Sequence, residues 1–412
     1  RAAGVFVQNS GGQLGQGTKV RIRGGSSLTG SNEPLYVVDG VPLTSGNQSD
    51  IDPSSVASME ILKDAAATAL YGSRASNGVV LITTKKGESG KLKADFEYQF
   101  GVSQAPKRLD MMDAAQYRIL FFEYTIRALL NNPLLIPDGE ISATNLGSFV
   151  SRESLETWYN DLVALRETAE ANGDSEITYA FPNDDQITIS TNNPIFRINY
   201  DTDWHDRAFR TGISQKGNLN LSGGSGSQKV FANINYLNQE GILIGNSYER
   251  FGGRLNLNSE WSDRISSNVS VGYARTANNK VPDEANDGNP VQMVLLPPAD
   301  ESDPDNDYIL RVRSSEYNPE TEIYGSTFLE TTNRLNANAS VNVDLTDDLI
   351  LSVDGGLDYL DLRDESQQGP ATQEGTPTGF SQLSTAEVVN YLFNGSLNYD
   401  KAIGDNQLNV LV

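Results

Sequence analysis

The stretch that decides the fold is KLKADFEYQFGV, residues 91–102, in which polar and apolar side chains alternate. Successive side chains of a β-strand point to opposite faces, so this alternation predicts a strand with one polar and one apolar face. The stretch fits a tilted strand that crosses a bilayer, which needs about 9–11 residues, better than the ~5–6 residues of a soluble strand. Residues 335–345 repeat the pattern. Together the two stretches predict β-strands that span a membrane.

Further candidate strands after residue 90 bring the predicted total to nine. They lie at 216–223, 229–238, 251–259, 265–275, 349–359, 388–399 and 407–412. The connections alternate between short and long, and the long ones are 103–215, 276–333 and 360–387. Short turns at one end and long loops at the other are typical of an outer-membrane barrel, in which the short turns face the periplasm.

A barrel in lipid must pair all its backbone polar groups, so it leaves no free strand edge in the hydrocarbon. Nine strands do not close an even-numbered barrel, and barrels that hold a plug have about 22 strands. We therefore expect further sequence at both ends of this stretch.

Composition excludes several classes of function. The 412 residues include no cysteine and a single histidine, His205, which removes disulfides, thiol catalysis and most zinc or catalytic-triad chemistry. No apolar run reaches the roughly 18 residues of a membrane-spanning helix. The net charge of −23 argues against a nucleic-acid partner. Residues 1–90 carry 8 Lys and Arg against 7 Asp and Glu, so the acid lies in the remainder, and the two parts are predicted to be separate domains.

Residues 20–87 read as short strands and helices of a small α/β unit. Asp39 and Gly40 form a turn pair between two apolar runs. Asp52 before Pro53 predicts the capped start of a short helix. Asp64 predicts the start of a second helix that ends near Gly72. The run GVVLITT, residues 78–84, is apolar on both faces and predicts a buried strand.

Five segments resemble the SusC/RagA family of TonB-dependent outer-membrane transporters. They are VRIRG (20–24), EPLYVVDGVPL (33–43), SMEILKDAAATALYGSRASNGVVLITTKKG (58–87), DWHDRAFRTG (203–212) and LNLSGGSGSQKVFANINYLNQEGI (219–242). The first three are similar to the plug of that family, and the last two to its second and third barrel strands. The resemblance implies a membrane β fold, with a small α/β plug domain in residues 1–90 inside a large antiparallel transmembrane barrel. Residues 91–412 would be the first part of that barrel, and the resemblance implies a signal peptide and a TonB-contacting segment before residue 1.

The resemblance also implies the function and the partners. A non-enzymatic protein of the Gram-negative outer membrane would import oligosaccharides or peptides with energy supplied by TonB. A SusD-like surface lipoprotein would cover it, with a dimer of such pairs as one arrangement. An alternative is a SusC-like barrel that serves a larger secretion, adhesion or motility assembly. A secreted glycan hydrolase is a third reading, but it leaves the alternating strands unexplained.

Two groups of residues are candidates for the function. Arginines on a plug inside a polar lumen need carboxylate partners, so Arg21, Arg23 and Arg74 are predicted to lock the plug to Asp95 and Glu97. Ordinary surface ion pairs are the alternative. Aromatic side chains on the long loops are candidates for stacking on sugar rings or peptide side chains. These are Tyr308, Tyr317, Tyr324 and Phe328.

Other motifs have simpler interpretations. Asp303, Asp305 and Asp307 follow Asp300 and Glu301 and offer carboxylates to calcium, but the stretch fails the EF-hand rule and is predicted to be a solvated loop. No other cofactor is expected. GQLGQGTK, residues 12–19, lacks the residue order of a phosphate-binding loop. His205 is predicted to be a hydrogen-bonded residue beside the interfacial anchor Trp204. Two helices are expected in the first long loop, at 113–124 and from Leu155 to Gly173.

Overall fold

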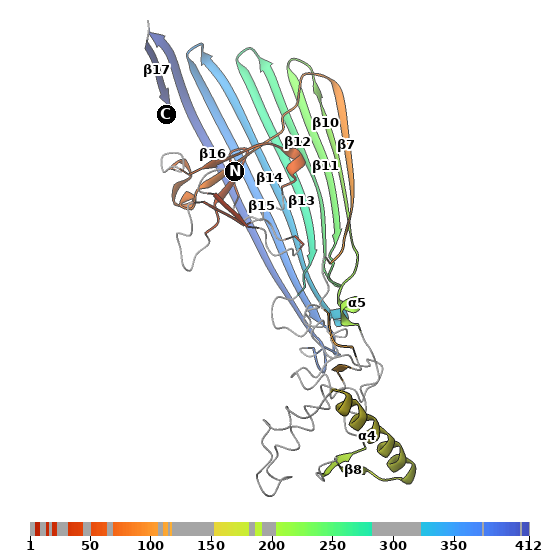
Figure 1. Cartoon of the computed structure of the whole chain (residues 1–412). Coiled ribbons are helices and arrows are strands. Elements are labelled where there is room, and N and C mark those ends of the chain that lie inside the picture. The colour runs from red at the N-terminus through yellow and green to blue at the C-terminus, as the bar shows by residue number, and fades with distance from the viewer. Residues whose placement is uncertain are drawn as a thin grey trace.

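The computed structural model describes residues 5–8, 14–15, 19–22, 32–43, 51–63, 69–105, 110–113, 116–117, 152–180, 186–191, 203–281, 323–372, 375–403 and 406–411. Most of these residues belong to one long antiparallel sheet, and a smaller sheet lies against one of its faces (Figure 1).

The long sheet has nine strands in the order β17-β16-β15-β14-β13-β12-β11-β10-β7, which confirms the predicted number. We call it the barrel wall. Its strands are β7 (Gly90–Ser103), β10 (Gly212–Gly224), β11 (Gln228–Glu240), β12 (Ser247–Ser262), β13 (Ile265–Asn279), β14 (Ser326–Thr346), β15 (Leu349–Gln368), β16 (Phe380–Ile403) and β17 (Asn406–Leu411). Consecutive strands are antiparallel neighbours, and the short turns between them gather at one end of the sheet (Figure 1).

The predicted loop boundaries are wrong where a strand continues beyond its pattern of alternating apolar residues. β15 and β16 stay paired from Leu360 opposite Val388 to Gln368 opposite Phe380, so the predicted loop 360–387 shrinks to residues 369–379. The predicted loop 276–333 likewise begins only after Asn279 and ends before Ser326. These extensions carry polar residues on both faces, so hydropathy does not reveal them although the backbone pairing continues.

The two faces of the barrel wall differ as the alternation predicts. On β13 the side chains of Val269, Val271 and Tyr273 are exposed on the outer face. Between them, Ser270 and Gly272 point to the inner face, where Ser270 contacts the smaller sheet. Neighbouring strands repeat this division, with exposed Leu255 and Leu257 on β12 and Val341 on β14. The outer face is therefore an apolar band, as lipid contact requires.

Replacing Val269 with arginine is expected to destabilise the barrel by about 2–4 kcal/mol, because Val269 lies midway along the apolar band of β13. The matched control is Ala277→Arg on the same strand and face, near the end of the band, where the expected cost is ~0–1 kcal/mol. Unfolding of the intact receptor in lipid vesicles by urea would measure both. Equal costs for the two variants would contradict a lipid-facing band.

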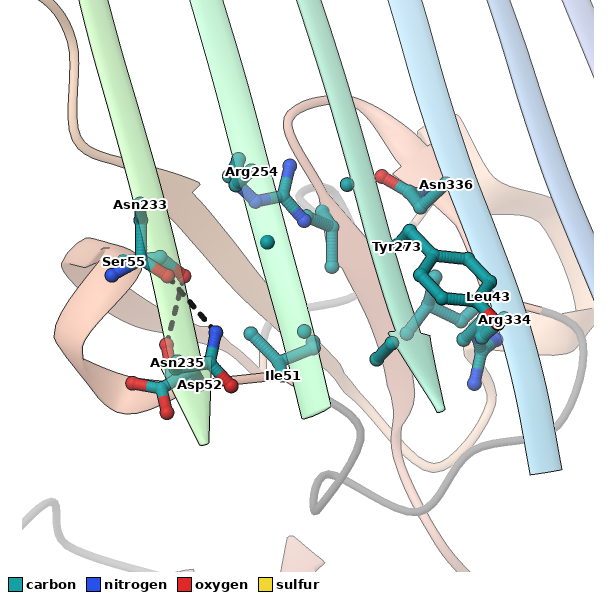
Figure 2. Close-up of a pocket in the computed structure, with 15 residues that line it drawn as sticks. Leu43, Ile51, Asp52, Ser55, Asn233, Asn235, Arg254, Tyr273, Arg334 and Asn336 are labelled. Atoms are coloured by element: carbon teal, nitrogen blue, oxygen red, sulfur yellow. Dashed lines mark hydrogen bonds between the residues drawn. The ribbon is translucent and has the colours of Figure 1, made fainter. Parts of the chain in front are cut away.

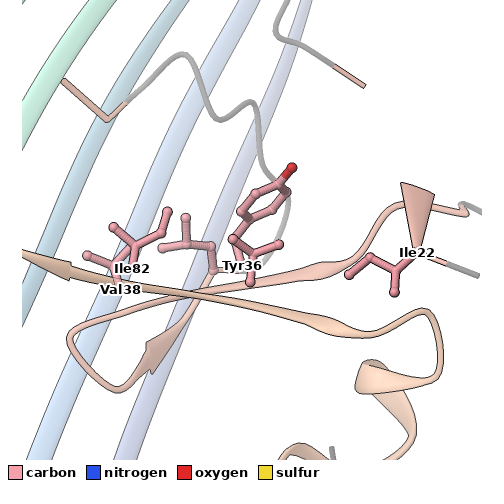
Figure 3. Close-up of a cluster of buried hydrophobic side chains, with 6 residues drawn as sticks. Ile22, Tyr36, Val38 and Ile82 are labelled. Carbon is pink, nitrogen blue, oxygen red and sulfur yellow. The ribbon is translucent and has the colours of Figure 1, made fainter. Parts of the chain in front are cut away.

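The smaller sheet has the strand order β4-β3-β6-β5, and we call it the plug sheet. β3 (Leu35–Val38) is parallel to β6 (Val79–Thr84), whereas β4 (Val41–Pro42) and β5 (Val56–Leu62) are antiparallel to their neighbours. One face buries a cluster that includes Tyr36, Val38 and Ile82 (Figure 3), and the other buries Leu35, Val37 and Val79. The central strands are therefore covered on both faces, as the apolar run 78–84 predicts.

Short elements complete the plug. The hairpin of β1 (Val5–Gln8) and β2 (Lys19–Ile22) packs on the plug sheet through Ile22. The predicted short helix at Pro53 is the single 3-10 turn η2 (Pro53–Ser55), capped by Asp52. The described part of the second predicted helix is the 3-10 segment η3 (Ala69–Ala75), which is interrupted at Gly72 because this glycine has a φ of 64°.

The connection between β7 and β10 contains a helix and a hairpin. α4 (Arg152–Asn172) confirms the second predicted loop helix, which ends before Gly173 at a φ of 81°. It packs on the hairpin of β8 (Glu176–Ala180) and β9 (Gln186–Ser190), beyond the end of the sheet opposite the short turns (Figure 1). α5 (Trp204–Ala208) then leads into β10. No helix in the described part of the chain has the length and apolar character of a membrane span.

The predicted helix at 113–124 is described only at its start. Asp113 accepts a hydrogen bond from the Gln116 backbone N–H at 2.7 Å, as the predicted cap requires. The rest of that helix after Tyr117 lies outside the described residues.

Candidate functional site

The plug sheet meets the inner face of the barrel wall mainly through the turn between β3 and β4. Asp39 at a φ of 46° and Gly40 at 90° make this turn tight. The Asp39 carboxylate is fixed within the plug, because it accepts hydrogen bonds from the Thr84 backbone N–H at 2.9 Å and from the Thr84 hydroxyl at 2.6 Å. The turn therefore projects toward the wall as a pre-formed unit.

Asp39 contacts three strands of the wall. Arg254 Nη1 on β12 lies 3.5 Å from Asp39 Oδ2, and Arg254 also donates to Ser270 Oγ at 2.9 Å. Ser270 on β13 donates to Asp39 Oδ2 at 3.3 Å. Asn338 on β14 donates to the Asp39 backbone oxygen at 2.6 Å. One turn residue thus binds a guanidinium, a hydroxyl and an amide of the barrel wall.

The residues after the turn reach β15 and β16. Asn390 Nδ2 donates to the Pro42 backbone oxygen at 2.8 Å. Val41 packs over Gly356, and a Cβ placed on this glycine would lie 2.5 Å from Val41 Cγ2. Glycine at position 356 therefore leaves the space in which the plug sits.

A second anchor lies at the 3-10 turn η2. The Asp52 side chain caps this turn, accepting from the Ser54 N–H at 2.6 Å, and also forms an ion pair with Arg250 of β12. Both side chains of the pair are buried, with exposures of 6% for Arg250 and 3% for Asp52. Asn233 of β11 donates to Ser54 Oγ at 3.2 Å. Separating a buried ion pair is costly because it leaves a buried charge without its partner. The Asp52–Arg250 pair therefore fixes this edge of the plug.

A third contact lies where β6 ends. Asn256 Nδ2 lies 2.9 Å from Thr84 Oγ1 and 2.6 Å from the Lys85 backbone oxygen. Asn278 similarly donates to the Leu14 backbone oxygen at 3.2 Å. Four of the wall's contacts are thus neutral amides that bind main-chain carbonyls, each contributing only about 0.5–1.5 kcal/mol net because water can replace them. The plug is held by many weak contacts and two ion pairs.

Introducing valine at Gly356 is expected to displace the β3–β4 turn, because its Cβ and methyl groups would occupy the space of Val41. Overpacking of this kind costs about 1–3 kcal/mol. Limited proteolysis of the intact receptor would detect the change as faster cleavage of the plug. Gly355→Val is the matched control, because a Cβ on Gly355 meets nothing within 4 Å. Equal cleavage of the two variants would contradict the seating of Val41 on Gly356.

The predicted locking residues lie elsewhere. Arg21 is exposed on β2, and Arg74 is exposed with its guanidinium 3.5 Å from the Leu43 backbone oxygen. Asp95 and Glu97 are exposed on β7, and Arg23 lies outside the described residues. No ion pair among the described residues joins these arginines to these carboxylates. The polarity differs from the prediction, because the plug supplies the carboxylates and the wall the arginines.

The sequence contains a signal for the wall arginines. In RFGGRLNLN, residues 250–258, Arg250, Arg254 and Asn256 alternate with the outward Phe251 and Leu255. Their place on the polar face of a barrel strand predicts that they face the lumen. Asp39 and Asp52 are the partners because the turn and the capped 3-10 segment face the wall. The sequence predicts where these two elements lie along the chain but not which way they face.

Of the other candidates, Tyr324 is 72% exposed beside the start of β14, and Phe328 is partly buried on that strand. Tyr308, Tyr317 and the calcium candidates Asp303, Asp305 and Asp307 lie outside the described residues. The prediction for His205 is wrong. Its ring is buried and stacks on Phe209 with centroids 5.8 Å apart, and neither ring nitrogen has a hydrogen-bond partner in the described structure. Trp204 is buried beside Ala208 and Ile244, not at a lipid interface.

The tyrosine of the plug core stays neutral. Burial, with a smaller effect of Glu33, raises the pKa of Tyr36 to about 12. The plug core therefore contributes no charge to the interface, and the interface charges come from Asp39, Asp52 and the wall arginines.

Comparison with known proteins agrees with this architecture. A family model described as the TonB-dependent Receptor Plug Domain matches residues 1–79. The TonB-dependent receptor P3 of Formosa agariphila is 30% identical over 292 residues, and SusC of Bacteroides thetaiotaomicron is 28% identical over 287 residues. These matches cover 70% and 68% of this chain but only 22% of each relative, so the chain spans a fraction of their length.

A solved structure has the same fold over the whole chain. The RagAB peptide transporter superposes with a TM-score of 0.71 at 23% identity, covering 100% of this chain and 44% of that one. The chain therefore belongs to the TonB-dependent outer-membrane receptors of the SusC/RagA type, of which it carries the plug and a nine-stranded part of the barrel.

Proposed function

We propose that the receptor to which this chain belongs imports oligosaccharides or peptides across the outer membrane, driven by TonB and together with a SusD-like surface lipoprotein. The observation that carries the proposal is the plug sheet seated on a polar inner wall by two ion pairs and neutral amides, while the outer wall is apolar. A plug held in this way blocks the lumen at rest, and a modest input of energy can release it.

The plug-locking role passes to a different set of charges. Asp39 and Asp52 of the plug, paired with Arg254 and Arg250 of the wall, take the role first predicted for Arg21, Arg23, Arg74, Asp95 and Glu97. The exposed Tyr324 at the long-loop end, where ligand would arrive, stays our candidate for ligand contact. Its aromatic ring suits stacking on a sugar ring or a peptide side chain.

An uptake experiment would identify the class of ligand. Cells that express the intact receptor would be given fluorescent pools of oligosaccharides and of oligopeptides, with TonB present or deleted. The proposal expects TonB-dependent uptake of one pool. Peptide transport is a property of RagAB, and the 23% identity leaves the ligand class here to the experiment.

The partners follow from co-purification. The proposal expects a SusD-like lipoprotein to co-purify with the receptor, alone or in a dimer of such pairs. Recovery of secretion, adhesion or motility components, with no uptake of either pool, would contradict import and support service in a larger assembly.

A further inference from the structure

We infer that the seam between the Asp39–Gly40 turn and the inner face of β12, β13 and β14 is the route by which ligand passes the plug, and that this turn closes it. The inference rests on the proposed import function and adds to it a place in the fold. It comes from two cavities that lie between the plug and the wall on opposite sides of the turn.

The first cavity lies toward the long-loop end. It has a volume of about 30 Å³ and lies between plug residues such as Leu43 and Asp52 and the wall (Figure 2). On the wall it touches Gly252–Arg254 of β12, Gly272–Ala274 of β13, and Arg334 and Asn336 of β14. It therefore lies on the side of the plug where ligand arrives.

The second cavity lies toward the short-turn end. It has a volume of about 340 Å³ and lies between plug residues such as Thr83 and Lys86 and wall strands β12 to β15. On the wall it touches Asn256 and Asn258 of β12, Asn268–Ser270 of β13, and Asn338 and Ser340 of β14. Because short turns face the periplasm, this cavity lies on the side where ligand leaves.

The boundary between the cavities coincides with the contacts of Asp39. On each of the three strands, a residue that lines the first cavity lies two positions from a residue that lines the second. The pairs, with the first-cavity residue named first, are Arg254 and Asn256, Gly272 and Ser270, and Asn336 and Asn338. Asp39 binds Arg254, Ser270 and Asn338, one residue from each pair. The Asp39–Gly40 turn and the adjoining strand β3 thus lie between the two spaces.

The contacts that close the seam are readily exchanged. Asn338 binds the backbone oxygen of Asp39, and Arg254 lies 3.5 Å from the Asp39 carboxylate, a long distance for an ion pair. Water or a ligand hydroxyl can replace each of these partners.

The wall of the seam also offers hydrogen-bonding groups that are not used in the closed state. Asn336 Nδ2 and Asn235 Oδ1 line the first cavity, are buried, and have no hydrogen-bond partner in the described structure. Amides, hydroxyls and two guanidinium groups make the seam suited to a flexible chain rich in hydroxyl or amide groups. Oligosaccharides and peptides both have that chemistry.

A reversible cross-link tests the route. A Cβ on Gly356 would lie 3.5 Å from Val41 Cβ, which is a disulfide distance, and Val41→Cys also removes the methyl group that would clash. The described chain has no cysteine of its own. The double variant Val41→Cys/Gly356→Cys of the intact receptor would tie the turn to β15 when oxidised and free it when reduced. Val41→Cys alone is the matched control.

The first readout needs no ligand. In planar bilayers, with potassium chloride as the conducted probe, mild urea is used to loosen the plug. We expect about a tenfold lower urea-induced conductance from the oxidised double variant than from its reduced form, because the disulfide holds the turn in place. Equal conductance in the two forms would overturn the route.

The second readout separates the route from the import function. In cells, the oxidised double variant is expected to lose TonB-dependent uptake of the pool that the wild-type receptor takes up, and dithiothreitol to restore it. Uptake that is unaffected by oxidation would overturn the route while import stands. Absence of uptake by the wild type would instead count against import, and the conductance result would still decide whether the turn closes the seam.

Discussion

Replacing Asp52 with alanine is expected to weaken the docking of the plug by about 3–5 kcal/mol, because the Arg250 guanidinium then stays buried without this carboxylate. The same change removes the cap of η2, which contributes a further ~0.5–2 kcal/mol. Urea titration of the intact receptor, followed by protease cleavage of the plug, would measure the loss as a lower urea midpoint.

Two further variants isolate the ion pair. Asp347→Ala removes the partner of Arg264 in a short turn, where the exposures of 62% and 96% predict a change within ~0.5 kcal/mol. The double variant Asp52→Asn/Arg250→Met removes both charges and keeps a capping side chain, so it should recover most of the lost stability. If Asp52→Ala shifted the midpoint no more than Asp347→Ala, Asp52 would not anchor the plug.

The barrel could be predicted from sequence because its signal is local. Alternation along Lys91–Val102 and residues 335–345 defines each strand and its lipid face without knowledge of its neighbours. The nine strands and the turn at Asp39 and Gly40 follow from such local patterns, and the structure confirms them. The strand extensions beyond the membrane, such as residues 360–368 of β15, could not be predicted because they depend on pairing with β16.

The locking charges could not be predicted for a different reason. The sequence shows that plug arginines and barrel carboxylates have opposite charges. Which charges of the plug and the wall pair, however, depends on which edge of the plug faces the wall. The plug presents the Asp39 turn and the Asp52 cap, and both positions favour short acidic side chains for local reasons. The same residues that shape the turn and cap the 3-10 segment therefore also bind Arg254 and Arg250.

The buried pair within the wall should have an effect of similar size on the barrel itself. Arg334 of β14 donates to both carboxylate oxygens of Asp358 on β15, from Nε at 2.9 Å and from Nη2 at 2.8 Å. The two side chains are 4% and 0% exposed, so neither charge is solvated by bulk water. Arg334→Ala is expected to cost about 3–5 kcal/mol because it leaves the Asp358 carboxylate buried without this guanidinium.

Three variants distinguish charge from geometry at this pair. Arg334→Lys keeps the charge but loses the two-pronged contact, so its cost should lie between those of wild type and Arg334→Ala. Arg334→Ala/Asp358→Asn removes the buried charge and should recover part of the loss. Arg363→Ala is the matched control, because Arg363 is 56% exposed beside Asp361 on the same wall. Thermal unfolding of the intact receptor, followed as the loss of its compact form in detergent gels, would rank these three variants and Arg334→Ala by their unfolding midpoints. A midpoint for Arg334→Ala equal to that of Arg363→Ala would mean that the pair does not stabilise the wall, since a buried carboxylate deprived of its guanidinium cannot be neutral in cost.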